Sequence, residues 1–344
     1  MIARSRWRPF AMSTISPLPA SPNTAAATAG APVRVGVIPA AGLGTRLRPL
    51  TSGALPKEML PVGRKLALER IVDELRAAGV TRIVFVLSPA KEDLIRRHFG
   101  DAAEDATFVY VLQPEMRGLG DAVLRARSAV GAAARFVVAL GDAVFEEPET
   151  GGLTRRLRDA TARADAAVGI AVQRVPPERI SRYGVVKPAA RRTPPPAPNN
   201  GGARNSVDDA LAGLSDTPII GGGGGFSLSA PFAITDIVEK PDPADAPSEF
   251  AAAARYVLSP DVFGHLENTP PGKNGEIQLT DALRALLVAE GKTGIAVPLA
   301  AGETRHDLGG LDSYFRAFAA FALADPDYGA SFADWLRNPL TPNT

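Results

Sequence analysis

The sequence predicts an α/β protein built on a doubly wound, mostly parallel sheet that is flanked by helices. From residue 33 onward, short apolar runs alternate with amphipathic segments, which is the pattern of repeated strand–helix units. One apolar run, 136–140, ends directly on Gly141-Asp142, and open α/β sheets bind ligands beyond the carboxyl ends of their strands. The 344 residues exceed the usual length of one domain, so we expect one main domain with appendages.

Hydrophobic periodicity assigns the individual elements. In segment 65–78, Leu68, Ile71 and Leu75 recur at helical spacing, and Gly79 follows as a C-terminal stop. The same criteria predict helices over 65–78, 90–99, 120–130, 153–163, 279–289 and 311–323. Short apolar runs predict strands over 33–38, 82–87, 107–112, 136–140, 167–172, 232–238, 255–258 and 293–299.

Composition divides the chain into four parts. Residues 1–32 offer few large apolar groups, so we expect a disordered extension before a main domain over 33–337. Inside that domain, residues 188–231 include a proline run and five consecutive glycines, which favour a flexible insertion. Residues 338–344 form a short tail.

The overall composition excludes several classes of protein. The 38 basic and 37 acidic residues nearly cancel, so no global field favours nucleic acid or a membrane surface as a partner. The absence of cysteine excludes disulfides, a thiolate nucleophile and a cysteine-ligated metal. No apolar run approaches the ~18 residues that a membrane span needs. We therefore expect a cytoplasmic protein with small-molecule partners.

A glycine-rich turn, A-A-G-L-G-T-R at 40–46, follows the first predicted strand. Gly42 and Gly44 let the backbone N–H groups approach a phosphate chain, while Thr45 and Arg46 add side-chain donors. Neither a Walker loop nor a dinucleotide fingerprint fits, because Leu47 stands where the third glycine of the fingerprint belongs. Taken alone, the turn is explained equally well as a tight structural turn or as a phosphate loop.

A second motif, P-K-E-M-L-P at 56–61, supports the phosphate loop. Its two prolines stiffen the chain around Lys57, and a lysine beside a glycine-rich turn neutralises a phosphate chain as a compact charge. A lone lysine is more often a solvated surface residue. The pairing of the two motifs favours the phosphate-binding role.

Further motifs complete a pattern that resembles a known family. They are Y-G-V-V at 183–186, V-E-K-P at 238–241 and G-E-I-Q-L-T-D at 275–281. With the two motifs above, their order and spacing over 33–337 resemble the bacterial UTP–glucose-1-phosphate uridylyltransferases. The resemblance implies a Rossmann-like nucleotidyltransferase sheet with a smaller sugar-binding portion. It also implies transfer of UMP from UTP to glucose 1-phosphate, with Mg²⁺ as cofactor, in a dimer or tetramer.

The resemblance also assigns residues to the nucleotide. Arg46 and Lys57 would hold the triphosphate and stabilise the charge that develops on the leaving pyrophosphate. Gln113 and Gly118 would meet uracil, because a glutamine amide carries both a donor and an acceptor. The remaining nucleotide contacts would come from the loop itself, at Ala41, Gly42, Gly44 and Thr45.

Sugar-phosphate and metal sites follow in the same way. Lys240 would bind the attacking phosphate and Glu239 the sugar hydroxyls, although an adjacent Glu-Lys pair is also a common solvated ion pair. Asp142 and Asp307 resemble the family's magnesium ligands, and magnesium prefers such hard oxygens. Asp307 is equally well explained as a helix N-cap. The sugar pocket would be completed by Gly184 and Glu276.

Some positions depart from the family pattern and leave alternatives open. Arg117 and Asp121 replace a typical lysine and histidine near the uracil segment, and 52–55 is one residue longer than usual. A related sugar-1-phosphate nucleotidyltransferase that uses dTTP or CTP would keep most of the same motifs. A non-catalytic sugar-nucleotide-binding protein would be expected to lack Arg46, Lys57, Asp142 or Lys240, and none is lost. A nicotinamide-dependent oxidoreductase is disfavoured by the missing third glycine.

Overall fold

The computed structural model describes residues 32–51, 55–190, 230–272 and 275–337. The expected disordered extension, nearly all of the expected insertion and the short tail lie outside these residues. No helix within the described part of the chain is both long enough and apolar enough to cross a membrane.

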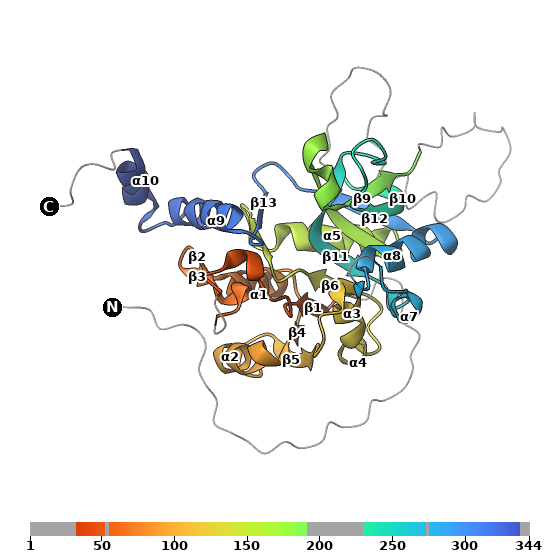
Figure 1. Cartoon of the computed structure of the whole chain (residues 1–344), viewed down its shortest axis with the longest axis horizontal. Helices are drawn as coiled ribbons and strands as arrows, with labels where there is room; N and C mark the ends of the chain where they lie inside the picture. Colours follow the sequence, from red (N-terminus) through yellow and green to blue (C-terminus); the bar gives the residue numbers. More distant parts are fainter. Residues whose placement is uncertain (1–31, 52–54, 191–229, 273–274, 338–344) are drawn as a thin grey trace, which may run out of the picture.

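A nine-stranded sheet forms the centre of the protein, and its strand order is β5-β4-β1-β6-β11-β8-β12-β10-β9 (Figure 1). These strands are β1 (Val35–Pro39), β4 (Arg82–Leu87), β5 (Thr107–Leu112), β6 (Phe136–Ala139), β8 (Val168–Arg174), β9 (Gly184–Pro188), β10 (Phe232–Glu239), β11 (Phe250–Leu258) and β12 (Gly294–Pro298). Two short ribbons accompany the sheet. One pairs β2 (Pro61–Val62) with β3 (Lys65–Leu66), and the other pairs β7 (Ala143–Glu146) with β13 (Thr304–Asp307).

The sheet is mixed, so the α/β fold is confirmed but the expectation of a mostly parallel sheet is not. β5, β4, β1 and β6 run parallel, in the arrangement of a doubly wound half. Beyond them, β11 is antiparallel to both β6 and β8, and β10 is antiparallel to both β12 and β9. The chain order crosses over between β1 and β6, so the phosphate loop after β1 and Asp142 after β6 meet at the topological switch point.

Helices cover both faces of the sheet. One apolar layer packs α1 (Ala67–Ala77), α2 (Pro89–Phe99) and α5 (Gly152–Arg163) against it, and the other packs α3 (Gly118–Arg125), α7 (Val262–Asn268) and α8 (Leu279–Arg284). The remaining turns are α4 (Arg127–Val130), η1 (Thr45–Leu47), η2 (Lys57–Met59), η3 (Pro177–Arg182) and the π-helical η5 (Ala285–Ala289). The C-terminal helices α9 (Leu311–Leu323) and α10 (Gly329–Arg337) extend to one side (Figure 1).

Most predicted elements are present, but three helices differ in detail and several strands were not predicted. The predicted helix over 65–78 begins as the β2–β3 hairpin, because Gly63 takes a left-handed conformation with φ 63°. The predicted helix over 120–130 is divided into α3 and α4, and that over 279–289 ends in a π turn. The β7–β13 ribbon and β9 have no counterpart among the predicted strands.

A buried ion pair joins four elements beneath the switch point. Arg255 of β11 is fully buried and donates to both carboxylate oxygens of Glu74 in α1, at 2.7 Å each. Glu74 also accepts from Thr154 of α5, and Arg255 donates to the carbonyl of Ala143 in β7. Because β7 begins directly after Asp142, this network fixes the strand that follows the predicted metal ligand.

Replacing Arg255 with Met should therefore lower the free energy of unfolding by about 3–5 kcal/mol, because it leaves the Glu74 carboxylate buried without its partner. Urea unfolding followed by circular dichroism measures the loss. The double variant Arg255→Met, Glu74→Gln removes both charges and should lose less. A single variant that loses only about 1 kcal/mol, as an exposed pair would, contradicts this account.

Candidate active site

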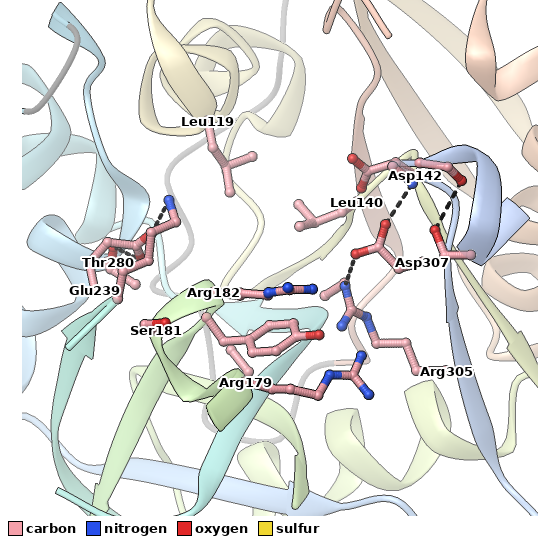
Figure 2. A pocket seen from close by; sticks show the side chains of 18 of the residues that line it. Leu119, Leu140, Asp142, Arg179, Ser181, Arg182, Glu239, Thr280, Arg305 and Asp307 are labelled. Atoms are coloured by element: carbon pink, nitrogen blue, oxygen red, sulfur yellow. Dashed lines mark hydrogen bonds and ion pairs between the residues drawn. The ribbon is translucent and has the colours of Figure 1, made fainter. Parts of the chain in front are cut away.

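One large cleft opens at the switch point, with a volume of about 910 Å³. Figure 2 shows Asp142, Asp307 and Arg305 on one side of it and Glu239 with Thr280 on the other. The sequence-predicted residues that line it are Arg46, Asp142, Gly184, Glu239, Lys240 and Asp307. These residues are widely separated in the chain, so the fold brings Arg46, both expected metal ligands and most of the expected sugar residues into one cleft. The other predicted residues lie outside its lining: Ala41, Gly42, Gly44, Thr45, Lys57, Gln113, Gly118 and Glu276.

The phosphate loop and the P-K-E-M-L-P segment lie against each other. Gly44 has φ 65°, and a Cβ there would lie 3.2 Å from the Cβ of Lys57. A Cβ on Gly42 would lie 3.8 Å from Lys57 Nζ. The glycines thus leave room for the lysine to cross the loop, while Thr45 and Arg46 stand exposed at its end. Ala41 is buried, so any contact it makes with a nucleotide comes from its backbone.

Lys57 forms an ion pair with Asp142, at 2.7 Å between Nζ and Oδ2. Burial is the largest influence on Lys57 and acts to lower its pKa, but the carboxylates of Asp142, Glu58 and Asp307 together outweigh burial and raise that pKa. Burial is also the largest influence on Asp142 and acts to raise its pKa, but Lys57, Arg305 and the hydrogen bonds to the carboxylate together hold the pKa below its usual range. Both groups are therefore charged at neutral pH.

The β7–β13 ribbon brings Asp307 beside Asp142. Asp307 is in register with Ala143, and Leu308 N donates to the carbonyl of Asp142 at 2.8 Å. Asp307 accepts from the backbone N–H of Gly309 and lies 3.4 Å from Arg305. The N-cap explanation for Asp307 is wrong, because α9 begins after Gly310 and no side chain caps it. The carboxylate instead lines the cleft.

This pair of carboxylates fits a magnesium ion. Magnesium usually binds through one or two carboxylates together with substrate phosphates, and it keeps several of its waters. Within the described ranges, no cluster of three or more histidine, aspartate or glutamate residues offers a complete protein-only site. The oxygen chemistry of Asp142 and Asp307 is therefore of the kind that a hard cation prefers.

The opposite side of the cleft combines a carboxylate, a hydroxyl and an ammonium group. Glu239, at the end of β10, accepts from Thr280 Oγ1 at 2.8 Å and pairs with Lys240 at 2.8 Å. Gly184 is needed there, because a Cβ would lie 2.9 Å from Thr280 Cγ2. Lys240 has φ 43°, a strained conformation for a residue with a side chain, and such strain concentrates at functional sites.

Three cleft arginines were not among the predicted site residues: Arg179, Arg182 and Arg305. Arg305 is nine-tenths buried and its Nε has no hydrogen-bond partner among the described residues. Its guanidinium lies 5.4 Å from the ring of Tyr183. Two of these arginines could have been found from the sequence, because Arg182 and Arg305 each stand two positions before a predicted site residue, in R-Y-G at 182–184 and R-H-D at 305–307.

Gln113, Gly118 and Glu276 lie together but outside the cleft lining. The side chain of Gln113 is buried, and its Nε2 donates to Gly118 O at 3.0 Å and to Asp121 Oδ2 at 2.8 Å. A Cβ on Gly118 would lie 2.8 Å from the Cβ of Glu276. Glycine is therefore required at position 118 because the 275–281 segment packs closely against it.

Comparison with known proteins gives the family. The model of the nucleotidyl transferase family matches residues 35–194 and 224–323, which include both halves of the cleft. The chain belongs to the nucleotidyl transferase family. Among relatives of this nucleotidyl transferase, UTP–glucose-1-phosphate uridylyltransferase 2 of Streptococcus pyogenes serotype M1 is 33% identical over 317 residues. That alignment covers 86% of the present chain and 92% of the relative.

Solved structures agree with the sequence relatives. A UDP-glucose pyrophosphorylase in complex with UDP-glucose is 28% identical, with a TM-score of 0.67, and the match covers 85% of this nucleotidyl transferase and all of that chain. The UTP-bound enzyme from Acinetobacter baumannii is 29% identical, with a TM-score of 0.68 and coverage of 90% and 100%. The resemblance inferred from the motifs is thus confirmed.

The Lys57–Asp142 pair can be tested directly in the nucleotidyl transferase. Replacing Lys57 with Met should raise the pKa of Asp142, because the largest attractive charge is lost while the carboxyl stays buried. Carbon-13 NMR titration of the Asp142 carboxyl measures this. Lys65→Met is the matched control, since Lys65 pairs with Asp73 instead. An unchanged Asp142 pKa in Lys57→Met would show that the pair has little influence.

Proposed function

We propose that this nucleotidyl transferase is a UTP–glucose-1-phosphate uridylyltransferase, which makes UDP-glucose and pyrophosphate. The observation that carries the proposal is the placing of Asp142 and Asp307 between two cationic groups of one cleft. Arg46, which lines the cleft, and Lys57, which pairs with Asp142, would bind the nucleotide, and Lys240 would bind the sugar phosphate. The names of the curated relatives supply the same pair of substrates.

The reaction asks the protein for position and charge rather than for covalent chemistry. An oxygen of the sugar phosphate forms a bond to the α-phosphorus of UTP, and the bond from that phosphorus to the bridging oxygen breaks. The electron pair leaves with pyrophosphate, so negative charge accumulates on the leaving group. Lys57 and Arg46 are placed to stabilise that charge. Asp142 orients Lys57 through their ion pair.

The carboxylates of Asp142 and Asp307 would hold Mg²⁺, with Gly309 N–H keeping Asp307 in place. When bound, the metal ion would neutralise phosphate charge and align the reacting phosphates. We propose this role on the donor set alone, since two carboxylates on one side of a phosphate-binding cleft match what magnesium requires.

The side chain of Gln113 favours uracil over cytosine. Both hydrogen bonds that Nε2 donates go to protein atoms, at Gly118 and Asp121. Among the described residues, no group donates to Oε1, so the amide would present an acceptor to a base. The N3–H of uracil is a donor, whereas N3 of cytosine is an acceptor. Thymine shares this N3–H, so Gln113 does not separate UTP from dTTP.

The glucosyl group would lie between Glu239 and Gly184, with Lys240 on its phosphate. Glu239 accepts from Thr280 and is held by Lys240, so its carboxylate is fixed before any hydroxyl donates to it. Thr280 thereby joins the predicted residues of the sugar site. Glu276 and Gly118 would act one layer away, by setting the position of the 275–281 segment.

We also propose a homo-oligomer, a dimer or tetramer, that works in the cytoplasm. Large apolar side chains are exposed on the two C-terminal helices, at Phe315, Phe318, Trp335 and Leu336. Burying such side chains between copies would stabilise an assembly. A cytoplasmic enzyme would draw UTP and glucose 1-phosphate from the pools of a metabolising cell, and a chain without cysteine suits a reducing compartment.

Pyrophosphate release tests the proposed reaction. Purified protein is incubated with glucose 1-phosphate and Mg²⁺, and UTP, dTTP, CTP, ATP and GTP are compared in parallel. We expect release with UTP, and Asp142→Asn should abolish it while the circular dichroism spectrum stays unchanged. Preference for dTTP or CTP would change the nucleotide assignment. No release with any nucleotide would favour a sugar-nucleotide-binding protein.

A second variant separates the two substrates. Lys240→Ala should raise the KM for glucose 1-phosphate by about tenfold or more, because it removes a charge-assisted contact to the sugar phosphate. The KM for UTP should change much less. Lys187→Ala, at an exposed lysine of β9, is the matched control. Equal changes in both KM values would contradict the proposed role of Lys240 in binding the sugar phosphate.

A further inference from the structure

A second lysine lies behind the phosphate loop. Lys91 stands in the first turn of α2, where a lysine is ordinarily solvated, yet only 6% of its surface is exposed. Its Nζ donates to the carbonyl of Ala40 at 2.7 Å and to the carbonyl of Gly42 at 2.5 Å. A third contact, at 2.8 Å, joins Nζ to the carboxylate of Glu58. All three hydrogens of the ammonium group are therefore used inside the protein.

The two carbonyl contacts fix the orientation of the loop. In a planar trans peptide, the C=O and the following N–H point in opposite directions. With the carbonyls of Ala40 and Gly42 turned toward Lys91, the N–H groups of Ala41 and Leu43 point away from it. The loop lies between the two lysines, because the Cβ direction of Gly42 points toward Lys57 Nζ.

Glu58 supplies the counter-charge and connects Lys91 to the P-K-E-M-L-P motif. Its side chain is fully buried, and its Cγ lies 3.3 Å from where a Cβ on Gly141 would stand. Burial raises the pKa of Glu58 and lowers the pKa of Lys91, which is the cost of keeping this pair inside the protein. The Lys91–Glu58 pair thus contacts the loop at 40–46 through Lys91, while Glu58 follows Lys57 in the chain and packs close to Gly141, the residue before Asp142.

We propose that Lys91 is a positioning residue for the nucleotide: by holding the carbonyls of Ala40 and Gly42, it turns the N–H groups of the loop toward the phosphates of UTP. The proposal rests on the proposed function and deepens it. Lys91 itself contacts no substrate, since the loop stands between its ammonium group and Lys57. Its effect should therefore fall on the nucleotide and spare the sugar phosphate.

The double variant Glu58→Gln, Lys91→Met tests this, because it removes both charges and leaves no carboxylate buried alone. We expect the KM for UTP to rise by about tenfold to a hundredfold, the cost of losing a charge-assisted hydrogen bond. The KM for glucose 1-phosphate should stay within about twofold. Ile95→Ala is the matched control, since Ile95 is buried on the same helix and should lower the Tm without changing either KM.

Calorimetric binding of UTP to the wild type and the variant gives a readout that does not depend on turnover. A higher Kd for UTP with a near-normal Tm supports the positioning role even if no pyrophosphate is released. The experiment therefore distinguishes failure of the positioning role from failure of the proposed uridylyltransferase reaction. Lys91→Gln keeps an uncharged amide that can still donate to the loop carbonyls, and it serves if the double variant does not fold; its KM for UTP should be intermediate. Unchanged UTP constants, or equal losses for both substrates, would overturn the positioning role.

Discussion

The buried guanidinium of Arg255 is the constraint on which the arrangement of the cleft depends. Arg255 belongs to the central strand β11, and it contacts Glu74 of α1 and the carbonyl of Ala143 in β7. Through Glu74 it is also linked to Thr154 of α5. A buried arginine must satisfy its donors inside the protein, so α1, β7 and β11 are held at fixed distances. Next to Arg255, Ala254 has φ 63° at an irregularity in the register of β11 with β8, and its carbonyl accepts from Leu140 N, two residues before Asp142.

Charge balance within the cleft follows a common rule. Three carboxylates of the cleft each pair with a lysine or arginine: Asp142 with Lys57, Asp307 with Arg305, and Glu239 with Lys240. A phosphate that enters such a cleft competes for the cations and frees carboxylate oxygens for a metal ion or for hydroxyl groups. The same groups can therefore stabilise the empty cleft and bind the substrates, at little cost in reorganisation.

Local sequence patterns predicted the elements whose burial is regular. β4 and β5 have the predicted bounds because their apolar runs are long, and α9 begins and ends where its periodicity does. Strand direction was not predictable, because a buried run reads the same in parallel and antiparallel sheets. The ribbon strand Thr304–Asp307 was missed because it is short and polar. Lys91 was missed because nothing local distinguishes a buried lysine from a solvated one in the first turn of a helix.

The β7–β13 ribbon has a consequence for the synthesis of the enzyme. His306 and Glu146 contact each other across the ribbon, although 160 positions separate them in the chain. A ribosome needs on the order of ten seconds or more to add that many residues. During this interval the loop at 40–46 and Asp142 have been synthesised and Asp307 has not. A growing chain therefore gains Asp307 long after Asp142, and a chain that stops between β7 and β13 lacks the carboxylate that the ribbon brings beside Asp142.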